Sequence, residues 1–303
     1  MNNNKLTGIV PPLITPLIDN ETLDIAGLEK LIEHVLKGGV HGVFILGTTG
    51  EAASLSLELS IQMIKETSRI LQGRVPLLVG ISDTSIVDSI LLAKIAHEEK
   101  ADAVVSTPPF YFSLNQRELI GYYETLLSQI QLPLYLYNIP SNTKISFEPK
   151  TIRKIAENHQ VIGFKDSSGN ATYLQSVMHE MRDYKNFSIF VGPEEMTAEM
   201  ILLGADGGVN GGANIFPQLY VDLYNAAKTA NIEEVRRLQT RLMKITTSIY
   251  TVGGSSSSYL KGVKSSLGIL GICNDYVASP LSKFVGAQKN EVESFLNNAL
   301  KDI

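Results

Sequence analysis

The residue with the most informative chemistry is a lysine at the end of an apolar run. Lys165 directly follows Val161, Ile162, Gly163 and Phe164. If Phe164 points outward from a strand, Lys165 points inward, where burial disfavours the ammonium form and lowers the lysine pKa. The neutral amine can then attack a carbonyl carbon and form a Schiff base. The alternative is a strand-end lysine that reaches solvent or pairs with a carboxylate.

Hydroxyl groups follow two other apolar runs. Tyr137 ends the run 134–137, and a phenol near a lysine and a carbonyl can relay protons. Thr48 and Thr49, between two glycines, offer hydroxyls and backbone N–H groups that suit a carboxylate or a phosphate. The alternatives are an aromatic side chain that fills the interior and a threonine that caps a helix.

The glycine-rich segment 204–212 lies where many (β/α) barrels bind phosphate. Its glycines could instead allow the backbone to approach a substrate without a phosphate closely.

No pattern in the chain predicts a bound metal. The single cysteine, Cys273, excludes a disulfide framework and a cysteine-rich zinc site. The histidines have no metal-ligand spacing to Cys, Asp or Glu; they are His34, His41, His97, His159 and His179. We therefore predict no metal.

Eight short apolar runs, each followed by a helical pattern, must position these side chains. The runs are residues 8–10, 43–46, 77–79, 103–105, 134–137, 161–164, 189–191 and 207–209. Each is continuous rather than alternating, as expected of parallel strands covered on both faces. No run has the weaker apolar character of an edge strand, so we predict an α/β fold, a closed (β/α)8 TIM barrel.

The strand pattern stops near Pro217 and helical spacing continues. Apolar residues step by three and four over 235–249 and 292–300, and the Gly/Ser segment 253–258 is interpreted as a tight loop between helices. We predict a barrel domain over residues 1–230 and a helical C-terminal region over 231–303.

Composition excludes several classes of function. The chain has 303 residues, 44% hydrophobic and 19% charged, which argues against disorder. Its net charge of −5 gives no electrostatic basis for binding nucleic acid. The start of the chain, Met1 to Lys5, is not typical of a signal peptide, and no apolar run is long enough to span a membrane. A cytoplasmic location is therefore expected.

In a (β/α) barrel the chemistry lies at the carboxyl ends of the strands. Polar residues follow five of the predicted strands and should converge on one mouth. The segments are 47–51, 108–111, 137–140, 165–168 and 192–195.

These motifs, in this order and spacing, resemble the dihydrodipicolinate synthase / N-acetylneuraminate lyase family of class I pyruvate-dependent aldolases. The resemblance rests on Gly47-Thr48-Thr49-Gly50-Glu51, Tyr137-Asn138-Ile139-Pro140 and Lys165, and covers nearly the whole chain. It implies a homotetrameric barrel enzyme without metal or organic cofactor.

The resemblance also implies a role for each residue that matches a motif. Lys165 would form the Schiff base with pyruvate or another 2-oxo acid, Tyr137 would relay protons, and Thr48 and Thr49 would relay protons and bind the carboxylate. Tyr111 would reach into a neighbouring subunit's site. Val209 would line the pyruvate pocket.

Two departures bear on the second substrate. Synthases of the family usually carry an arginine where this chain has Asn142, and Lys144 replaces a following glycine. Asparagine cannot clamp a carboxylate as arginine does, whereas Lys144 could supply a point charge.

The lyase side of the family is matched only in part. Gly192, Glu194 and Glu195 resemble a segment that contacts sugar hydroxyls, and Ser167 fits the same pattern. Gly211 stands where the sialic acid lyases have a serine.

The leading hypothesis is a Schiff-base lyase or aldolase acting on a 2-oxo acid, a 2-keto-3-deoxy sugar acid or a sialic-acid-like substrate. The alternatives are dihydrodipicolinate synthesis from pyruvate and aspartate semialdehyde, a phosphosugar enzyme that uses the glycine cluster, and a non-catalytic pyruvate-binding barrel. The joint presence of Lys165, Tyr137, Thr48 and Thr49 argues against the last.

Overall fold

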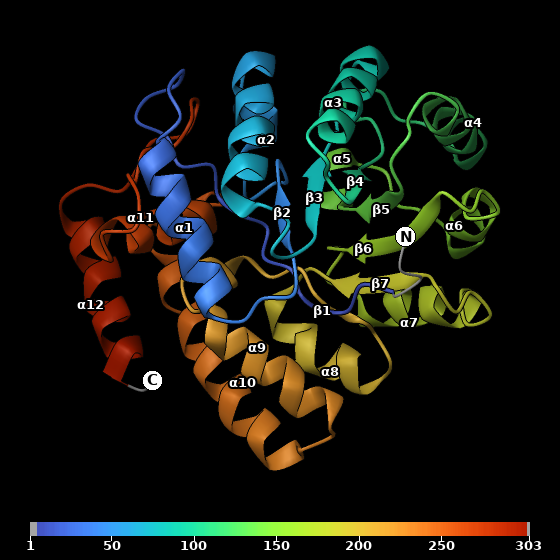
Figure 1. Ribbon diagram of the computed structural model, residues 1–303. Helices are drawn as coiled ribbons and strands as arrows, with labels where there is room; N and C mark the ends of the chain where they lie inside the picture. The colour runs from blue at the N-terminus through green and yellow to red at the C-terminus, as the bar shows by residue number, and fades with distance from the viewer. Residues whose placement is uncertain (1–4, 302–303) are drawn as a thin grey trace.

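The computed structural model describes residues 5–301, which form one parallel sheet surrounded by helices (Figure 1). The eight strands are β1 Gly8–Ile9, β2 Val43–Ile45, β3 Leu77–Gly80, β4 Ala103–Ser106, β5 Leu134–Asn138, β6 Val161–Asp166, β7 Ser188–Val191 and β8 Gly207–Gly208. Their order in the sheet is β1-β8-β7-β6-β5-β4-β3-β2. Each of the eight strands predicted from the sequence is confirmed.

Both faces of the sheet are buried, which explains the continuous apolar runs. Within β5, Leu134 and Leu136 pack outward into the core beneath the helices, whereas Tyr135 and Tyr137 belong to a separate inner cluster. The inner cluster consists of Val10, Phe44, Leu78, Ala103, Val105, Tyr135, Tyr137, Ile139, Phe190 and Val209. Because successive side chains alternate between faces, residues two apart share the interior.

Backbone hydrogen bonds also link the segment after β1 to β2. His41 N donates to Ile9 O over 2.8 Å, Phe44 N donates to Pro11 O over 3.0 Å, and Leu13 N donates to Phe44 O over 2.8 Å. These bonds join the two ends of the strand order, and the closed barrel itself stays a prediction.

Glycine is required where β1 and β8 meet. A Cβ atom on Gly207 would lie 1.9 Å from the carbonyl oxygen of Gly8. The glycines of β8 therefore reflect the close approach of its backbone to β1.

Nine helices alternate with or follow the strands before residue 230 in the described chain. They are α1 Ile25–Lys37, α2 Leu57–Leu71, α3 Ile86–Glu98, α4 Gln116–Leu127, α5 Pro140–Thr143, α6 Pro149–Ile155, α7 Ala171–Glu180, α8 Thr197–Leu202 and α9 Pro217–Lys228. Local chemistry sets several ends: Asn115 and Glu118 form a capping box on α4, and Pro149 occupies the first turn of α6 as predicted.

The C-terminal region is helical, as predicted. It contains α10 Ile232–Thr246, α11 Ser258–Ile269 and α12 Ala287–Lys301. The predicted extension of the first of these helices to Ile249 is wrong, because α10 ends at Thr246 and Ile249 begins a separate 3-10 turn. The Gly/Ser segment is a tight loop in which Ser255 N donates to Ser258 Oγ over 3.0 Å.

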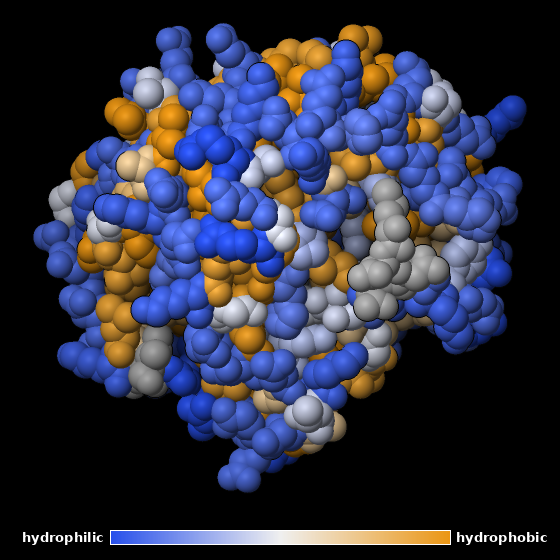
Figure 2. Space-filling view, in the orientation of Figure 1, coloured by the Kyte–Doolittle hydropathy of each residue, from blue (hydrophilic) through white to orange (hydrophobic). Residues whose placement is uncertain are grey.

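The surface is mixed in character. The face in Figure 2 is mostly hydrophilic, with hydrophobic patches between the upper ends of α2 and α3 and over α12. Within residues 5–301, no helix has both the length and the apolar character needed to cross a membrane.

Candidate active site

Lys165 lies inside the sheet, as the sequence predicts from the outward position of Phe164. Its side chain leaves β6 toward the inner cluster, with Nζ 3.9 Å from the ring centroid of Tyr137 and 5.1 Å from that of Phe44. The residue is 6% exposed. Burial lowers the pKa of the Lys165 ammonium below its ordinary value, although Tyr137 and Asp166 act in the opposite direction. The structure therefore favours a reactive amine at this position.

Tyr137 is the partner of Lys165 in the β5–β6 register. Its hydroxyl lies 3.4 Å from Thr48 Oγ1 and 3.4 Å from Ser167 Oγ. Burial alone would raise the phenol pKa, but the Lys165 charge and the hydrogen bonds from Ser167 and Thr48 bring it below its ordinary value. A phenol that ionises more readily beside an amine suits proton transfer.

Thr48 and Thr49 lie in a turn that follows β2. The turn is fixed by the backbone bond from Glu51 N to Thr48 O, 3.1 Å long. Thr48 is exposed toward the cavity, whereas Thr49 is buried and its Oγ1 lies 3.1 Å from the hydroxyl of Tyr259. The structure thus brings both threonines to the mouth that contains Lys165.

A cavity of about 300 Å³ contains the Lys165 side chain. It collects most of the residues selected from the sequence. Its lining consists of Pro12, Thr48, Thr49, Tyr137, Ile139, Lys165, Ser167, Gly192, Pro193, Glu194, Glu195, Val209, Gly211, Tyr250 and Tyr259.

A second cavity, about 530 Å³ in volume, adjoins the first. The two cavities share Thr48, Tyr137, Ile139 and Tyr259 in their walls. The wall of the second cavity is mainly apolar, but several hydroxyl and amide groups also line it, among them Ser82, Thr107, Asn142, Thr143, Ser256 and Ser257. Among the described residues that line it, none is a lysine or an arginine.

Asn142 lines this second cavity, but Lys144 lines neither. The Lys144 ammonium donates to the carbonyl oxygen of Ser141 over 2.6 Å and is exposed. Its position therefore gives no support to a carboxylate grip that would replace the missing arginine.

Glu194 is buried, and its carboxylate already has protein partners. Gly212 N donates to Oε1 over 2.7 Å, Tyr250 donates to Oε2 over 3.1 Å, and Tyr220 also donates to Oε2. Burial raises the pKa of Glu194 to about 7. Contact of Glu194 with a sugar hydroxyl stays a prediction, and the exposed Glu195 is the freer of the two carboxylates.

A backbone donor of the glycine-rich segment 204–212 also has a protein partner. The N–H of Gly212 already donates to Glu194 and is not free to bind a phosphate. This contact argues against the phosphosugar reading.

Tyr111 lies apart from both cavities. Its side chain is 88% exposed, its φ is 94°, and its ring packs edge-on against Phe112, which is 77% exposed. Within this one chain Tyr111 does not join the other candidate residues.

Tyrosines from the C-terminal half complete the site, and the sequence reasoning missed them. Tyr220 lies in α9, Tyr250 in the turn after α10 and Tyr259 in α11. A Cβ atom on Gly211 would lie 1.5 Å from the Tyr259 hydroxyl. Glycine at 211, noted from the sequence as a departure, is thus the local signal that another side chain occupies this space.

The described residues contain no cluster of three or more His, Cys, Asp or Glu side chains able to hold a metal ion.

Comparison with known proteins identifies the family. The model of the dihydrodipicolinate synthetase family matches residues 5–299. The chain belongs to this family. Its homologues and structural neighbours are lyases and aldolases, so the resemblance seen in the sequence is confirmed.

Three relatives show the range of the family. A structure of dihydrodipicolinate synthase from Bacteroides thetaiotaomicron is 60% identical, with a TM-score of 0.95, covering 97% of this chain and 98% of that one. Escherichia coli YagE, whose structure contains pyruvate, is 26% identical, with a TM-score of 0.91 and 97% and 98% coverage. The E. coli protein named Probable 2-dehydro-3-deoxy-D-pentonate aldolase YjhH is 28% identical over 96% of this chain and 97% of its own length.

Proposed function

We propose that this chain is a Schiff-base-forming, pyruvate-dependent lyase that cleaves or forms a 2-keto-3-deoxy sugar acid. The observation that carries the proposal is the buried Lys165 amine, 3.9 Å from the ring of Tyr137 and in one cavity with Thr48 and Thr49. Pyruvate bound to YagE is consistent with the same small substrate.

In the cleavage direction, the neutral Lys165 amine adds to the C2 ketone of the sugar acid, and Tyr137 donates its phenolic proton to the departing hydroxyl, which gives water, a protonated imine and a Tyr137 phenolate. The phenolate then accepts the proton of the C4 hydroxyl, the C3–C4 bond breaks, and its electron pair passes to the imine to give an enamine and an aldehyde. The enamine takes a proton at C3 from Tyr137, and addition of water to the resulting imine releases pyruvate and the free lysine while a proton returns to Tyr137. The lowered pKa values of both side chains suit these proton transfers.

The second cavity favours a neutral, hydroxylated portion of the substrate. A carboxylate buried without a cationic partner is costly, and the described lining supplies no lysine or arginine. Hydroxyl and amide groups, such as those of Ser82, Thr107 and Asn142, can exchange hydrogen bonds with sugar hydroxyls instead. The aldolase name of YjhH is consistent with this substrate class.

The test combines trapping with a substrate panel. Pyruvate and borohydride should leave a reduced adduct that peptide mapping places on Lys165. Turnover is then compared for 2-keto-3-deoxy sugar acids, N-acetylneuraminate and aspartate semialdehyde. We expect at least ~10-fold higher kcat/KM for a sugar acid than for aspartate semialdehyde, a difference that one good polar contact can produce. A label elsewhere, or none, would refute the mechanism.

The second candidate is dihydrodipicolinate synthesis. The 60% identity with the protein described as dihydrodipicolinate synthase favours it. Efficient condensation of aspartate semialdehyde with pyruvate would select this activity. Trapping of pyruvate at Lys165 without turnover of either substrate class would favour the remaining hypothesis, a barrel that binds pyruvate without catalysis.

We further propose a closed (β/α)8 barrel that assembles as a cytoplasmic homotetramer and uses no metal or organic cofactor. The bonds between the segment after β1 and β2 support closure. The exposed rings of Tyr111 and Phe112 support assembly, since a second subunit would bury them. A monomer in sedimentation at micromolar concentration would contradict the assembly and leave Tyr111 without its implied role.

A further inference from the structure

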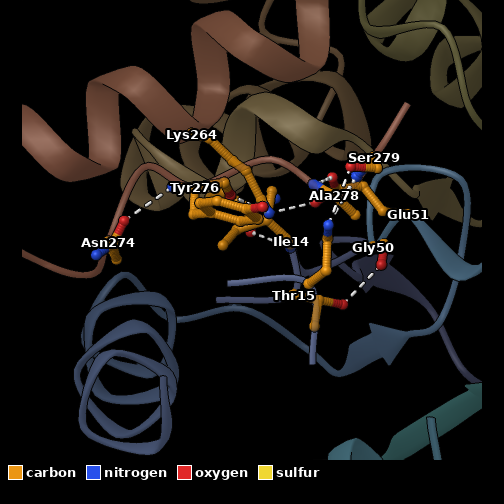
Figure 3. Close-up of polar contacts among 11 residues, drawn as sticks. Ile14, Thr15, Gly50, Glu51, Lys264, Asn274, Tyr276, Ala278 and Ser279 are labelled. Carbon is orange, nitrogen blue, oxygen red and sulfur yellow. Dashed lines mark hydrogen bonds and ion pairs between the residues drawn. The ribbon is translucent and has the colours of Figure 1, made fainter. Parts of the chain in front are cut away.

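A buried ion pair lies directly behind the turn that carries the two threonines. Figure 3 shows Glu51, the last residue of this turn, and Lys264 of α11 pointing toward one another. Their side chains, 3% and 0% exposed, form an ion pair between Oε2 and Nζ. Neither residue has a role in the mechanism proposed above.

The backbone at Glu51 suggests that its side chain, rather than its conformation, explains its presence. Glu51 has φ 59° and ψ 25°, in the left-handed region that disfavours residues with a Cβ atom. A strained non-glycine residue persists when its surroundings fix it and often marks a functional position.

The turn transmits the position of Glu51 to Thr48. Glu51 N donates to Thr48 O over 3.1 Å, and this bond fixes the backbone of one residue relative to the other. Gly50 between them is held from the other side, since Thr15 Oγ1 donates to its carbonyl oxygen over 2.6 Å.

Helix α11 holds the turn at two points. Its Tyr259 hydroxyl contacts Thr49 Oγ1, and its Lys264 ammonium contacts the Glu51 carboxylate. The remaining polar atoms of the pair bind the segment that follows α11: Lys264 donates to Tyr276 O, and Ala278 N donates to Glu51 Oε1, each over 2.7 Å (Figure 3).

We propose that Glu51 and Lys264 are positioning residues that hold Thr48 and Thr49 where they bind the carboxylate of pyruvate. This inference rests on the proposed function. It assigns the C-terminal region a part in binding the substrate, through a pair that does not itself touch Lys165.

The charges of the pair depend on one another. Burial raises the pKa of Glu51 and lowers that of Lys264, and the attraction between the two groups opposes both shifts. Removing one partner leaves an unpaired buried charge, whereas removing both leaves none. The double variant therefore separates loss of positioning from loss of stability.

The experiment compares Glu51→Gln, Lys264→Met and the double variant with Asp275→Asn as a matched control. Asp275 is also buried and ion-paired in the segment after α11, to Lys283 and Lys289, but it has no hydrogen bond to the turn. The readouts are the pyruvate concentration for half-maximal borohydride trapping, measured well below each melting temperature, and the melting temperature itself.

We expect the pyruvate concentration for half-maximal trapping to rise at least about 10-fold in both single variants and less than about 2-fold in Asp275→Asn. The double variant should regain most of the melting temperature that the single variants lose. Its pyruvate concentration for half-maximal trapping should stay raised. A double variant that traps pyruvate as the unaltered protein does, or one that fails to fold, would show that the pair serves stability alone and would overturn the inference. If the unaltered protein itself does not trap pyruvate, the proposed function fails instead.

Discussion

Replacement of Glu194 by glutamine should change how the stability of the protein depends on pH. Burial raises the pKa of this carboxyl group from 4.5 to about 7 in the folded protein. Between these values the unfolded chain has lost the proton while the folded chain keeps it. The free energy of unfolding therefore falls as pH rises through this window. The contribution of protonated Glu194 to stability is complete only below the window.

The size of the effect follows from the shift. Each pKa unit corresponds to about 1.4 kcal/mol, so a shift of this size costs the folded protein about 3 kcal/mol between pH 4 and pH 8. Glutamine keeps an oxygen that can accept the bond from Gly212 N but does not titrate. The difference in free energy of unfolding between Glu194→Gln and the unaltered protein should therefore move by about 3 kcal/mol in favour of the variant over this range.

Denaturant unfolding at pH 4, 6 and 8 measures this difference directly. The matched control is Glu195→Gln, because the neighbouring carboxyl group is exposed rather than buried. A Glu194→Gln difference that is constant with pH, or that moves against the variant, would refute a raised pKa at this site.

Three further outcomes test the site. Lys165→Ala should lose essentially all turnover and borohydride labelling, and Lys165→Arg should not restore them, because the guanidinium keeps its proton. Tyr137→Phe should lower kcat by roughly 10²-fold with an unchanged melting temperature, as expected for loss of one acid–base group; an unchanged kcat would make Tyr137 an interior packing residue. Gly211→Ala should cost about 1–3 kcal/mol in denaturant unfolding, because its Cβ would overlap the Tyr259 hydroxyl, and much less in a Tyr259→Ala background. Equal costs in both backgrounds would contradict that contact.

The sequence predicted the strands and the residues at their ends well, because both depend on local order in the chain. A continuous apolar run is enough to indicate a strand covered on both faces, and alternation along β6 is enough to turn Lys165 inward once Phe164 is outward. The turn after β2 and the end of β5 meet at the same mouth because both follow the carboxyl ends of parallel strands.

Contacts between distant segments were not predictable in this way. Tyr259 lies 210 residues after Thr49, and no pattern near either residue indicates the other. Tyr220 and Tyr250, from later helical segments, bind the carboxyl group of Glu194, and no pattern near Glu194 indicates either tyrosine. A buried lysine in a helix, such as Lys264, is equally invisible until its partner in the β2 turn is located.

The hydrogen bond from Ala278 N to Glu51 can form only after most of the chain has been synthesised. The two residues are 227 positions apart, so Glu51 leaves the ribosome long before its partner exists. At about 5–20 residues per second the interval is roughly 11–45 s. Throughout this interval the turn after β2 lacks the hydrogen bond that Ala278 N donates to Glu51. Removing the last 30 residues of the chain would remove Ala278 as well, so the turn that carries Thr48 and Thr49 would never gain this bond.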